Sequence, residues 1–337
     1  MTEDILSVSI VIPTYNCEKT IRACLESIVR QDYPKDKIEV IIVDGGSRDK
    51  TIEVVKSFAK LLKIKVFYER TGRPETATAI GYNYARNDLI ANIPSDNILP
   101  HSEWLKRMTE PFKNSIKVVA TQPLRYCYRK DLGLLDRYFA LFGVNDPLAY
   151  YLNKRDRLSW LEESWALMGE AKDMGDFFLV KFTPNEVPTL GANGYIVKRE
   201  VIQKVTLDIF NFFHIDSNFD LIRMGCNLYG IVKTDIIHQS GEKFLKYFQK
   251  RIRYMQIYFR DKNRRRYHLY NPSSYKDKIN LLKFIVFSLT LIKPTSDAVK
   301  GYRKIYDKAW FLHPVICFGI LFTYAVGALV QIQKEGL

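Results

Sequence analysis

The chain has 337 residues, of which 47% are hydrophobic, and a formal net charge of +14 at pH 7. This length and apolar content can bury a substantial core and leave room for an added segment. The five cysteines show no C-x-x-C spacing, which excludes a dense disulfide framework and a structural zinc site and favours a reduced, intracellular-facing protein.

Strands and helices are predicted to alternate along the first hundred residues, which indicates an α/β protein with a mostly parallel sheet flanked by helices. The start of the chain, MTEDILSVS, lacks a basic segment and a long apolar run, so no cleaved signal is expected. The expected elements are strands at Ser7–Ile12, Glu39–Val43, Lys65–Glu69 and Asp88–Ile93, and helices at Glu18–Gln31, Lys50–Leu62 and Glu75–Arg86.

Polar residues follow three of these strands. Thr14–Asn16 follow the first strand, Asp44–Asp49 follow the second, and Asp96 and Asn97 follow the fourth. In an open α/β sheet the ligand lies at the carboxyl ends of the strands, so we expect these residues to share one crevice. Acidic oxygens suit Mg²⁺ or Mn²⁺ carrying a substrate's phosphates. The pattern therefore predicts a metal-bound nucleotide.

Three motifs occur in a specific order: V-I-P-T-Y-N at Val11–Asn16, Q-D-Y-P at Gln31–Pro34, and V-D-G-G-S-R-D-K-T at Val43–Thr51. With these three motifs in this order, the sequence resembles the family 2 glycosyltransferases, and the resemblance covers roughly its first 240 residues. The resemblance implies a GT-A-type, nucleotide-diphospho-sugar transferase-like fold. Gly45 departs from the pattern, because the family usually has a second Asp at that position.

The resemblance also implies a set of donor-binding residues. Asp44 would accept hydrogen bonds from a base or ribose, but Asp-Gly is also a strong turn signal, so a turn residue is the alternative. Gly191–Gly194 resembles the family's loop beside the acceptor and donor sugar, with an ordinary tight turn as its alternative. The complete donor-binding set is Pro13, Thr14, Tyr15, Asn16, Asp44, Asp49, Ser95, Asp96, Gly191 and Asn193.

Two residues are candidate metal ligands. Asp96 matches the second Asp of the family's D-x-D motif, whose first position is Pro94 here. Its carboxylate would bind the Mg²⁺ or Mn²⁺ that bridges the donor diphosphate; the alternative is a cap for a helix beginning near Pro100. His238 follows the strand expected at Tyr229–Ile237 and stands where related enzymes often place another ligand, although a structural role is its alternative.

His214 and Asp216 are both candidates for the catalytic base. Counting back from Gly225, the family's usual position falls on His214, whereas side-chain type favours Asp216. Either group can remove a proton from an acceptor hydroxyl, and the resemblance implies inversion at the anomeric carbon. The alternative is that Asp216 or Asp220 caps the helix that follows. A lipid phosphate acceptor is already anionic and would need no base.

The C-terminal part differs sharply in composition. Residues 243–308 hold 18 Lys and Arg against 4 Asp and Glu, which accounts for the whole net charge. Trp310–Val330 has no charged residue over 21 positions and is long enough to cross a membrane once. Ile279–Ile292 is shorter and indicates an interfacial or re-entrant segment. We expect a glycosyltransferase domain at 1–240, followed by basic amphipathic and membrane-anchoring helices at 241–337.

The basic flank precedes the expected span, so the catalytic domain is predicted on the cytoplasmic side of a cell membrane or endomembrane. An anionic leaflet, rather than nucleic acid, is the expected partner of the basic region. The whole pattern predicts an inverting hexosyltransferase that uses a UDP- or GDP-sugar and a lipid-linked or glycan acceptor, such as a polyprenyl phosphate or a lipid-linked saccharide. The alternative is a membrane-anchored nucleotide-binding or scaffold protein with an inactive transferase domain.

Overall fold

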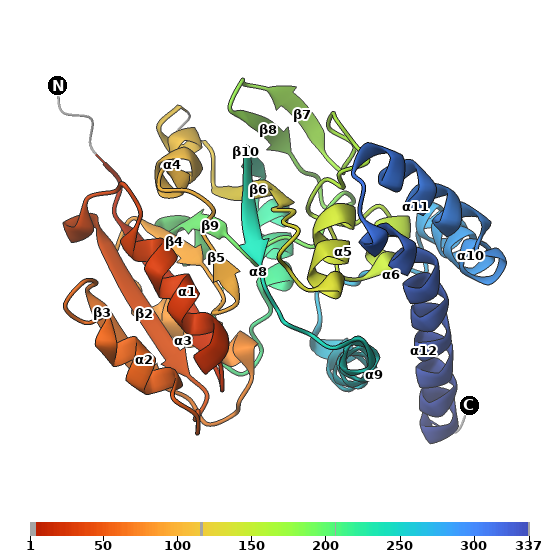
Figure 1. Ribbon diagram of the computed structural model, residues 1–337, viewed down its shortest axis with the longest axis horizontal. Coiled ribbons are helices and arrows are strands. Elements are labelled where there is room, and N and C mark those ends of the chain that lie inside the picture. The colour runs from red at the N-terminus through yellow and green to blue at the C-terminus, as the bar shows by residue number, and fades with distance from the viewer. Residues whose placement is uncertain (1–4, 115–116, 206, 336–337) are drawn as a thin grey trace. The chain divides into compact units, whose positions relative to one another are not determined.

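The computed structural model describes residues 5–114, 117–205 and 207–335, and the chain divides into two compact units (Figure 1). Unit 1 comprises residues 1–127 and 169–239, and unit 2 comprises residues 128–168 and 240–337. The C-terminal helices therefore share their unit with a segment from the middle of the chain. Residues 1–4, where part of the signal prediction falls, lie outside the described residues.

Unit 1 is built on one sheet with the strand order β3-β2-β1-β4-β9-β6-β10-β8-β7, and β5 pairs with β10 off this path. β1 to β4 run parallel, and β9 lies antiparallel between β4 and β6. The strands are β1 Val8–Thr14, β2 Ile38–Asp44, β3 Ile64–Tyr68, β4 Leu89–Asn92, β5 Asn97–Ile98, β6 Ala120–Tyr126, β7 Glu170–Asp173, β8 Phe177–Lys181, β9 Tyr195–Lys198 and β10 Leu228–His238.

The helices of unit 1 connect these strands and flank the sheet. Close packing of α3 on β1 depends on Gly81, because a Cβ at that position would lie 2.2 Å from Cγ1 of Val11. The helices are α1 Glu18–Val29, α2 Thr51–Ser57, α3 Pro74–Tyr84, α4 Trp104–Asn114, α7 Arg199–Ile202 and α8 His214–Arg223, with a short 3₁₀ helix at Lys35–Lys37.

The register of the parallel strands determines where the site lies. Apolar β-branched residues of β1 and β2 are buried on both faces, as a central parallel strand requires. Thr14 pairs with Asp44, and Asp44 pairs with Tyr68 in β3. The three strands therefore end level, and the loops that leave them begin at the same edge of the sheet.

Unit 2 is helical. Its core contains the buried side chains of Phe142, Tyr247, Phe284, Trp310 and Ile316. An ion pair of 2.5 Å between Lys154 and Asp277 joins the middle segment to the C-terminal helices. The elements are α5 Leu134–Phe142, α6 Pro147–Tyr151, α9 Phe244–Asp261, α10 Tyr275–Thr290, α11 Ile292–Lys304 and α12 Leu312–Glu335, with 3₁₀ helices at Lys262–Arg264 and Lys308–Phe311.

One segment among the described residues is long and apolar enough to cross a membrane. It spans Lys308–Val330 with a mean hydropathy of 1.8, and 22% of its most apolar 18-residue stretch is buried inside the protein. The C-terminal half of α12 extends past α10 and α11 (Figure 1). α10 and α11 meet at an angle of 80° and, by length and composition, are together apolar enough for a broken span or a re-entrant pair. By length and composition these helices fit the predicted span and the predicted re-entrant segment.

Candidate active site

The buried carboxylate of Asp44 organises the loop after β2. Its Oδ1 accepts hydrogen bonds from the hydroxyls of Thr14 at 3.0 Å and Ser47 at 2.6 Å. Its Oδ2 accepts the backbone N–H groups of Gly46 at 3.0 Å and Ser47 at 2.8 Å. These four bonds give Asp44 the turn-forming role that was its alternative interpretation. Its direct contact with a nucleotide stays a prediction.

Asn16 and Asp49 tie the loop after β1 to the loop after β2. Asn16 adopts a φ of 48°, and its side-chain oxygen accepts the N–H of Arg48 at 2.8 Å. Asp49 accepts the N–H of Glu18 at 3.1 Å and the hydroxyl of Thr51 at 2.5 Å. Partial burial raises the pKa of Asp49, but these hydrogen bonds outweigh it and leave the pKa below its usual value. Asp49 thus stabilises the loops at neutral pH, and this stabilisation is lost as the pH falls through its lowered pKa.

Gly45 lies beside these loops and is closely surrounded. A Cβ placed on Gly45 would lie 2.9 Å from Oε1 of Glu69, 3.3 Å from Cα of Gly72 and 3.4 Å from Cδ2 of Tyr15. The side chain of Tyr15 is 57% exposed. Sequence reasoning gave Glu69 no role, although the missing Asp at position 45 was a reason to look for a carboxylate at a neighbouring strand end.

The loop after β4 adjoins the loop after β1. The thiol of Cys17 accepts the hydroxyl of Thr51 at 3.7 Å, and Ser95 lies near enough to lower the pKa of this thiol. Burial has the larger effect and raises the pKa of Cys17. The predicted donor-binding residues Thr14, Asn16, Asp49 and Ser95 therefore lie in contiguous loops, and Pro13 pairs with Val43 in the β1–β2 register just below them.

Asp96 and His238, the two predicted metal ligands, lie together. Oδ2 of Asp96 is 3.3 Å from Nε2 of His238, and the two side chains are 31% and 13% exposed. β5 brings them together, because Asn97 pairs with His238 in its antiparallel ladder with β10. The backbone carbonyl of Asp96 also accepts the N–H of Gln239 at 2.8 Å. The next helix, α4, begins only at Trp104, so Asp96 does not cap it.

Asn193 connects this pair to the Gly191–Gly194 loop. Its side-chain oxygen accepts a hydrogen bond from Asn97 at 3.2 Å, and its amide donates to the hydroxyl of Tyr126 at 2.8 Å. Asn97 also donates to Oδ1 of Asp96 at 3.1 Å, which leaves Oδ2 facing His238. The loop requires left-handed backbone, with φ of 112° at Gly191, 51° at Asn193 and 89° at Gly194.

The two base candidates lie at the start of α8 but differ in accessibility. A Cβ on Gly191 would lie 3.0 Å from Cβ of His214, so the glycine lets the loop contact this histidine closely. His214 is partly exposed, whereas Asp216 is fully buried. Asp216 lies in the first turn of α8 and Phe213 is the N-cap residue, so Asp216 does not cap the helix. Exposure favours His214 as the group that a substrate can reach.

The described residues contain no cluster of three or more His, Cys, Asp and Glu side chains able to hold a metal ion. Asp96 and His238 supply one oxygen and one nitrogen. Mg²⁺ and Mn²⁺ sites in phosphate chemistry use one or two protein ligands and take further oxygens from the substrate. The pair therefore fits a cation that is held jointly by the protein and a diphosphate.

Residues 9–164 match the model of the family described as glycosyl transferase family 2. This match covers less than half of the chain and shows that this part is similar to the family 2 glycosyltransferases. The resemblance inferred from the three motifs of the first 51 residues is thereby confirmed.

Two curated relatives are 36% identical to the chain. They are glycosyltransferase AglE of Haloferax volcanii, over 110 residues, and a dolichyl N-acetyl-α-D-glucosaminyl phosphate 3-β-D-2,3-diacetamido-2,3-dideoxy-β-D-glucuronosyltransferase of Methanococcus voltae, over 109 residues. Each match covers 32% of this chain and 36% or 34% of the relative. The chain thus matches about a third of the length of these relatives.

The fold is similar to that of a solved mannosyltransferase, PcManGT from Pyrobaculum calidifontis, with a TM-score of 0.54 and 17% sequence identity. The similarity covers 96% of this chain and 87% of the mannosyltransferase. The predicted α/β fold of GT-A type is therefore confirmed.

Proposed function

We propose that the protein transfers a hexose, with inversion, from a nucleotide-sugar donor to a lipid-linked acceptor. The observation that carries the proposal is the Asp96–His238 pair, 3.3 Å apart, which Asn97 and Asn193 connect to the Gly191–Gly194 loop. The loops at residues 14–16 and 44–49 supply the nucleotide side of the site. PcManGT was solved with GDP-Man and Mn²⁺, which supports a nucleotide-sugar donor and a divalent cation for this chain as well.

Asp96 and His238 would hold the Mg²⁺ or Mn²⁺, which when bound neutralises charge on the departing nucleotide diphosphate. His238 would bind it as the neutral imidazole, whose Nε2 faces Asp96. Asn97 orients the Asp96 carboxylate by its hydrogen bond to Oδ1. Gly191 and Asn193 shape the pocket for the donor sugar, because their left-handed backbone lets the loop approach the ligand without a bulky side chain.

His214 is the base in this mechanism. Its neutral imidazole accepts the proton of an acceptor hydroxyl while the hydroxyl oxygen attacks the anomeric carbon and the bond to the diphosphate breaks on the opposite face. Asn218 anchors α8 by donating to the backbone carbonyl of His214 at 2.8 Å and by accepting the hydroxyls of Tyr195 and Tyr229. Asp216 lies two residues further on, in the same first turn of α8, and is fully buried.

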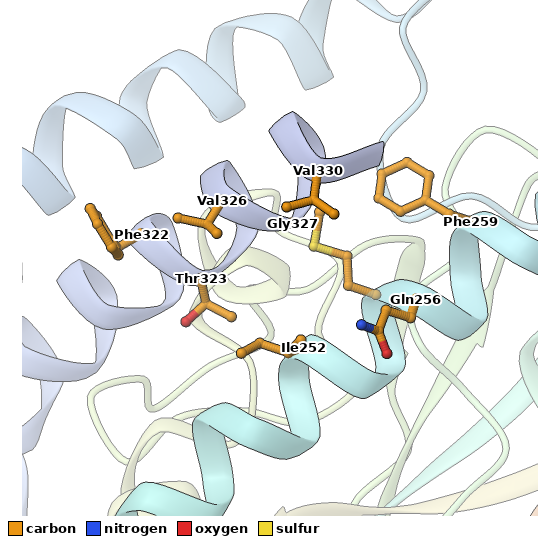
Figure 2. A pocket seen from close by; sticks show the side chains of 9 residues that line it. Ile252, Gln256, Phe259, Phe322, Thr323, Val326, Gly327 and Val330 are labelled. Carbon is orange, nitrogen blue, oxygen red and sulfur yellow. The ribbon is translucent and has the colours of Figure 1, made fainter. Parts of the chain in front are cut away.

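A lipid-linked acceptor is favoured by a groove in unit 2. Side chains of α9 and α12 face each other across a cavity of about 270 Å³ (Figure 2). Exposed apolar groups border it, including Ile252 at 44%, Phe322 at 66% and Val326 at 45%. The complete lining is Ile252, Met255, Gln256, Phe259, Phe322, Thr323, Val326, Gly327 and Val330.

Small residues of α12 bring the two helices together beside this groove. A Cβ on Gly319 would lie 2.5 Å from the ring of Phe248, and one on Gly327 would lie 2.5 Å from the sulfur of Met255. On α9 the exposed basic residues Lys246, Arg253 and Arg260 recur every seven positions, so they form a stripe next to the groove-lining face. An apolar groove with a cationic border fits the polyprenyl chain of an anionic lipid.

The name of the Methanococcus voltae relative describes a sugar transferase acting on a dolichyl-linked N-acetylglucosaminyl phosphate. This supports a lipid-linked saccharide as the acceptor class. The apolar segment at Lys308–Val330 and the basic residues of α9 support attachment of the protein to the cytoplasmic face of a membrane, as the charge distribution predicts.

The function is tested by measuring nucleotide release from a panel of UDP- and GDP-sugars by the detergent-purified protein. Polyprenyl phosphate and polyprenyl-linked saccharides are added as acceptors, in Mn²⁺ or in EDTA. We expect release from one donor that depends on both the metal and the lipid. Nucleotide binding with no release from any donor would instead support the membrane-anchored, inactive alternative.

Val326→Trp is expected to raise the KM for a long-chain acceptor by about 15- to 60-fold, because an indole in the groove displaces two or three methylenes at about 0.8 kcal/mol each. Leu329→Trp is the matched control, since Leu329 lies in the same turn of α12, is 61% exposed and does not line the groove. Steady-state kinetics with long-chain and short-chain acceptors measures both. Equal KM values for the two variants with the long-chain acceptor would contradict the assignment of the groove.

A further inference from the structure

The first half of α12 is an internal helix of unit 2. Its fully buried side chains are His313, Ile316, Cys317 and Ile320. Ile316 and Ile320 belong to the core of this unit. The two ring nitrogens of His313 are hydrogen-bonded to the hydroxyls of Tyr138 at 3.0 Å and Tyr151 at 3.2 Å. This half of the apolar segment therefore faces protein on one side and cannot be surrounded by lipid.

The second half of α12 is joined to α9 by polar groups. The hydroxyl of Tyr324 donates to Oδ2 of Asp146, and Nη1 of Arg251 lies 3.3 Å from the same oxygen. The side chains of Asp146 and Arg251 are both largely buried. Tyr324 lies five residues past the centre of the segment Lys308–Val330, which is about 8 Å along a helix. If α12 crossed a hydrocarbon core of about 30 Å, this ion pair would lie within it.

α9 would carry further cations to the same depth. Gly319 of α12 packs against Phe248 of α9. Two turns further on, Gly327 packs against Met255, so α9 accompanies this half of α12 in the same direction. The exposed basic residues of α9 are Lys246, Lys250, Arg253 and Arg260. Cations within the hydrocarbon are costly, so a crossing α12 is disfavoured by the helix packed on it.

The large exposed apolar side chains of α12 form a stripe along one face of the helix. The stripe consists of Val315, Phe318, Phe322, Val326 and Leu329. Their spacing of three or four residues keeps them on one side from the first half of the helix to the last turns. Phe322 and Val326 also line the groove between α9 and α12. An apolar stripe with basic residues beside it is typical of a helix that lies in the interface of an anionic membrane.

We propose that α12 and α9 lie along one anionic leaflet without crossing the bilayer, an inference that rests on the membrane attachment proposed above. The stripe of α12 enters the acyl chains, while the basic residues of α9 stay with the lipid phosphates. The groove then opens sideways into the leaflet, so a polyprenyl chain enters it without leaving the membrane. A second copy of the chain fits the stripe less well, because it would bring the cations of two α9 helices together.

The side of the bilayer on which α12 ends tests the proposal. Lys334→Cys reports the end of α12, and Lys60→Cys, at an exposed position, reports the side of unit 1. Both full-length variants are expressed in bacteria and treated with a membrane-impermeant maleimide, in spheroplasts and in inverted membrane vesicles. The wild type gives the background from the five native cysteines. We expect both positions to react in inverted vesicles and neither in spheroplasts. Reaction of Lys334→Cys in spheroplasts would reveal a crossing helix and overturn the proposal.

Depth in the bilayer is the second readout. Phe318→Trp and Leu329→Trp lie about 16 Å apart along the helix axis, since each residue advances it by about 1.5 Å. Quenching by lipids brominated at successive acyl carbons measures the depth of each indole in vesicles that contain phosphatidylglycerol, with the four native tryptophans subtracted. We expect the two depths to agree within about 5 Å. A larger difference would contradict a helix lying along the leaflet. Leu61→Trp, at an exposed position of unit 1, is the unquenched control.

The remaining outcomes also decide the proposal. Absence of quenching at both positions of α12 would overturn it, and self-association of the same protein would then assign the stripe to a second copy. Neither readout uses turnover, so the topology and the proposed function can fail separately. Lipid-dependent sugar transfer by a protein whose α12 crosses the bilayer would support the function and contradict this topology. Equal depths without any sugar transfer would do the reverse.

Discussion

Replacing Asp96 with alanine is expected to lower kcat/KM for sugar transfer by about 10²- to 10³-fold, the loss typical when a group that stabilises developing charge is removed. The reason lies in the local geometry. Oδ2 of Asp96 and Nε2 of His238 are 3.3 Å apart, and the carboxylate is the only anionic member of this pair. Without it, the imidazole alone faces the cation. Steady-state kinetics in Mn²⁺ measures the loss.

A second readout separates metal binding from folding. Mn²⁺ binding, followed by electron paramagnetic resonance of the free ion, is expected to weaken in both Asp96→Ala and His238→Ala while the thermal melting curve stays that of the wild type. Asp173→Asn is the matched control, because Asp173 is an exposed acid of the same unit that pairs with Lys233 at 2.7 Å. Wild-type Mn²⁺ affinity in Asp96→Ala would refute the metal assignment.

The sheet was predictable from the sequence because its central strands are continuous apolar runs. The strand predicted at Glu39–Val43 corresponds to β2 at Ile38–Asp44, and the glycine-bearing turn precedes β9 at Tyr195–Lys198 as expected. The helix predicted at Lys50–Leu62 ends early, at Ser57. The N–H of Phe58 bonds to the carbonyl of Val55, so the last turn tightens, and apolar periodicity does not report such a change.

The contact that forms the candidate metal site was not derivable from local pattern. β5 consists of two residues and therefore shows no apolar periodicity. Its antiparallel pairing with β10 nevertheless places Asn97 beside His238, which lies at the end of β10 and far along the chain. The family resemblance nominated Asp96 and His238 separately, while only the sheet topology brings them together. Motifs thus identified the residues, and long-range pairing determined which of them meet.

Burial was the other quantity that the sequence could not supply. His214 and Asp216 are two positions apart, and their side-chain chemistry left the choice of base open. The structure buries Asp216 completely and leaves His214 partly exposed against Gly191. Glu69 shows the same limit, since nothing in a strand-end glutamate of the sequence indicates that its Oε1 is buried close to Gly45.

His214→Ala is expected to lower kcat about 10²- to 10⁴-fold with a polyprenyl-linked saccharide as acceptor, because an attacking hydroxyl must lose its proton to a positioned base. The same variant is expected to retain wild-type kcat with polyprenyl phosphate, whose anionic oxygen needs no base. Asp216→Asn is expected to affect both acceptors equally, since a fully buried side chain acts only through the position of α8. Single-turnover rates with the two acceptors measure this difference. A loss in Asp216→Asn confined to the hydroxyl acceptor, with His214→Ala unaffected, would transfer the role of base to Asp216.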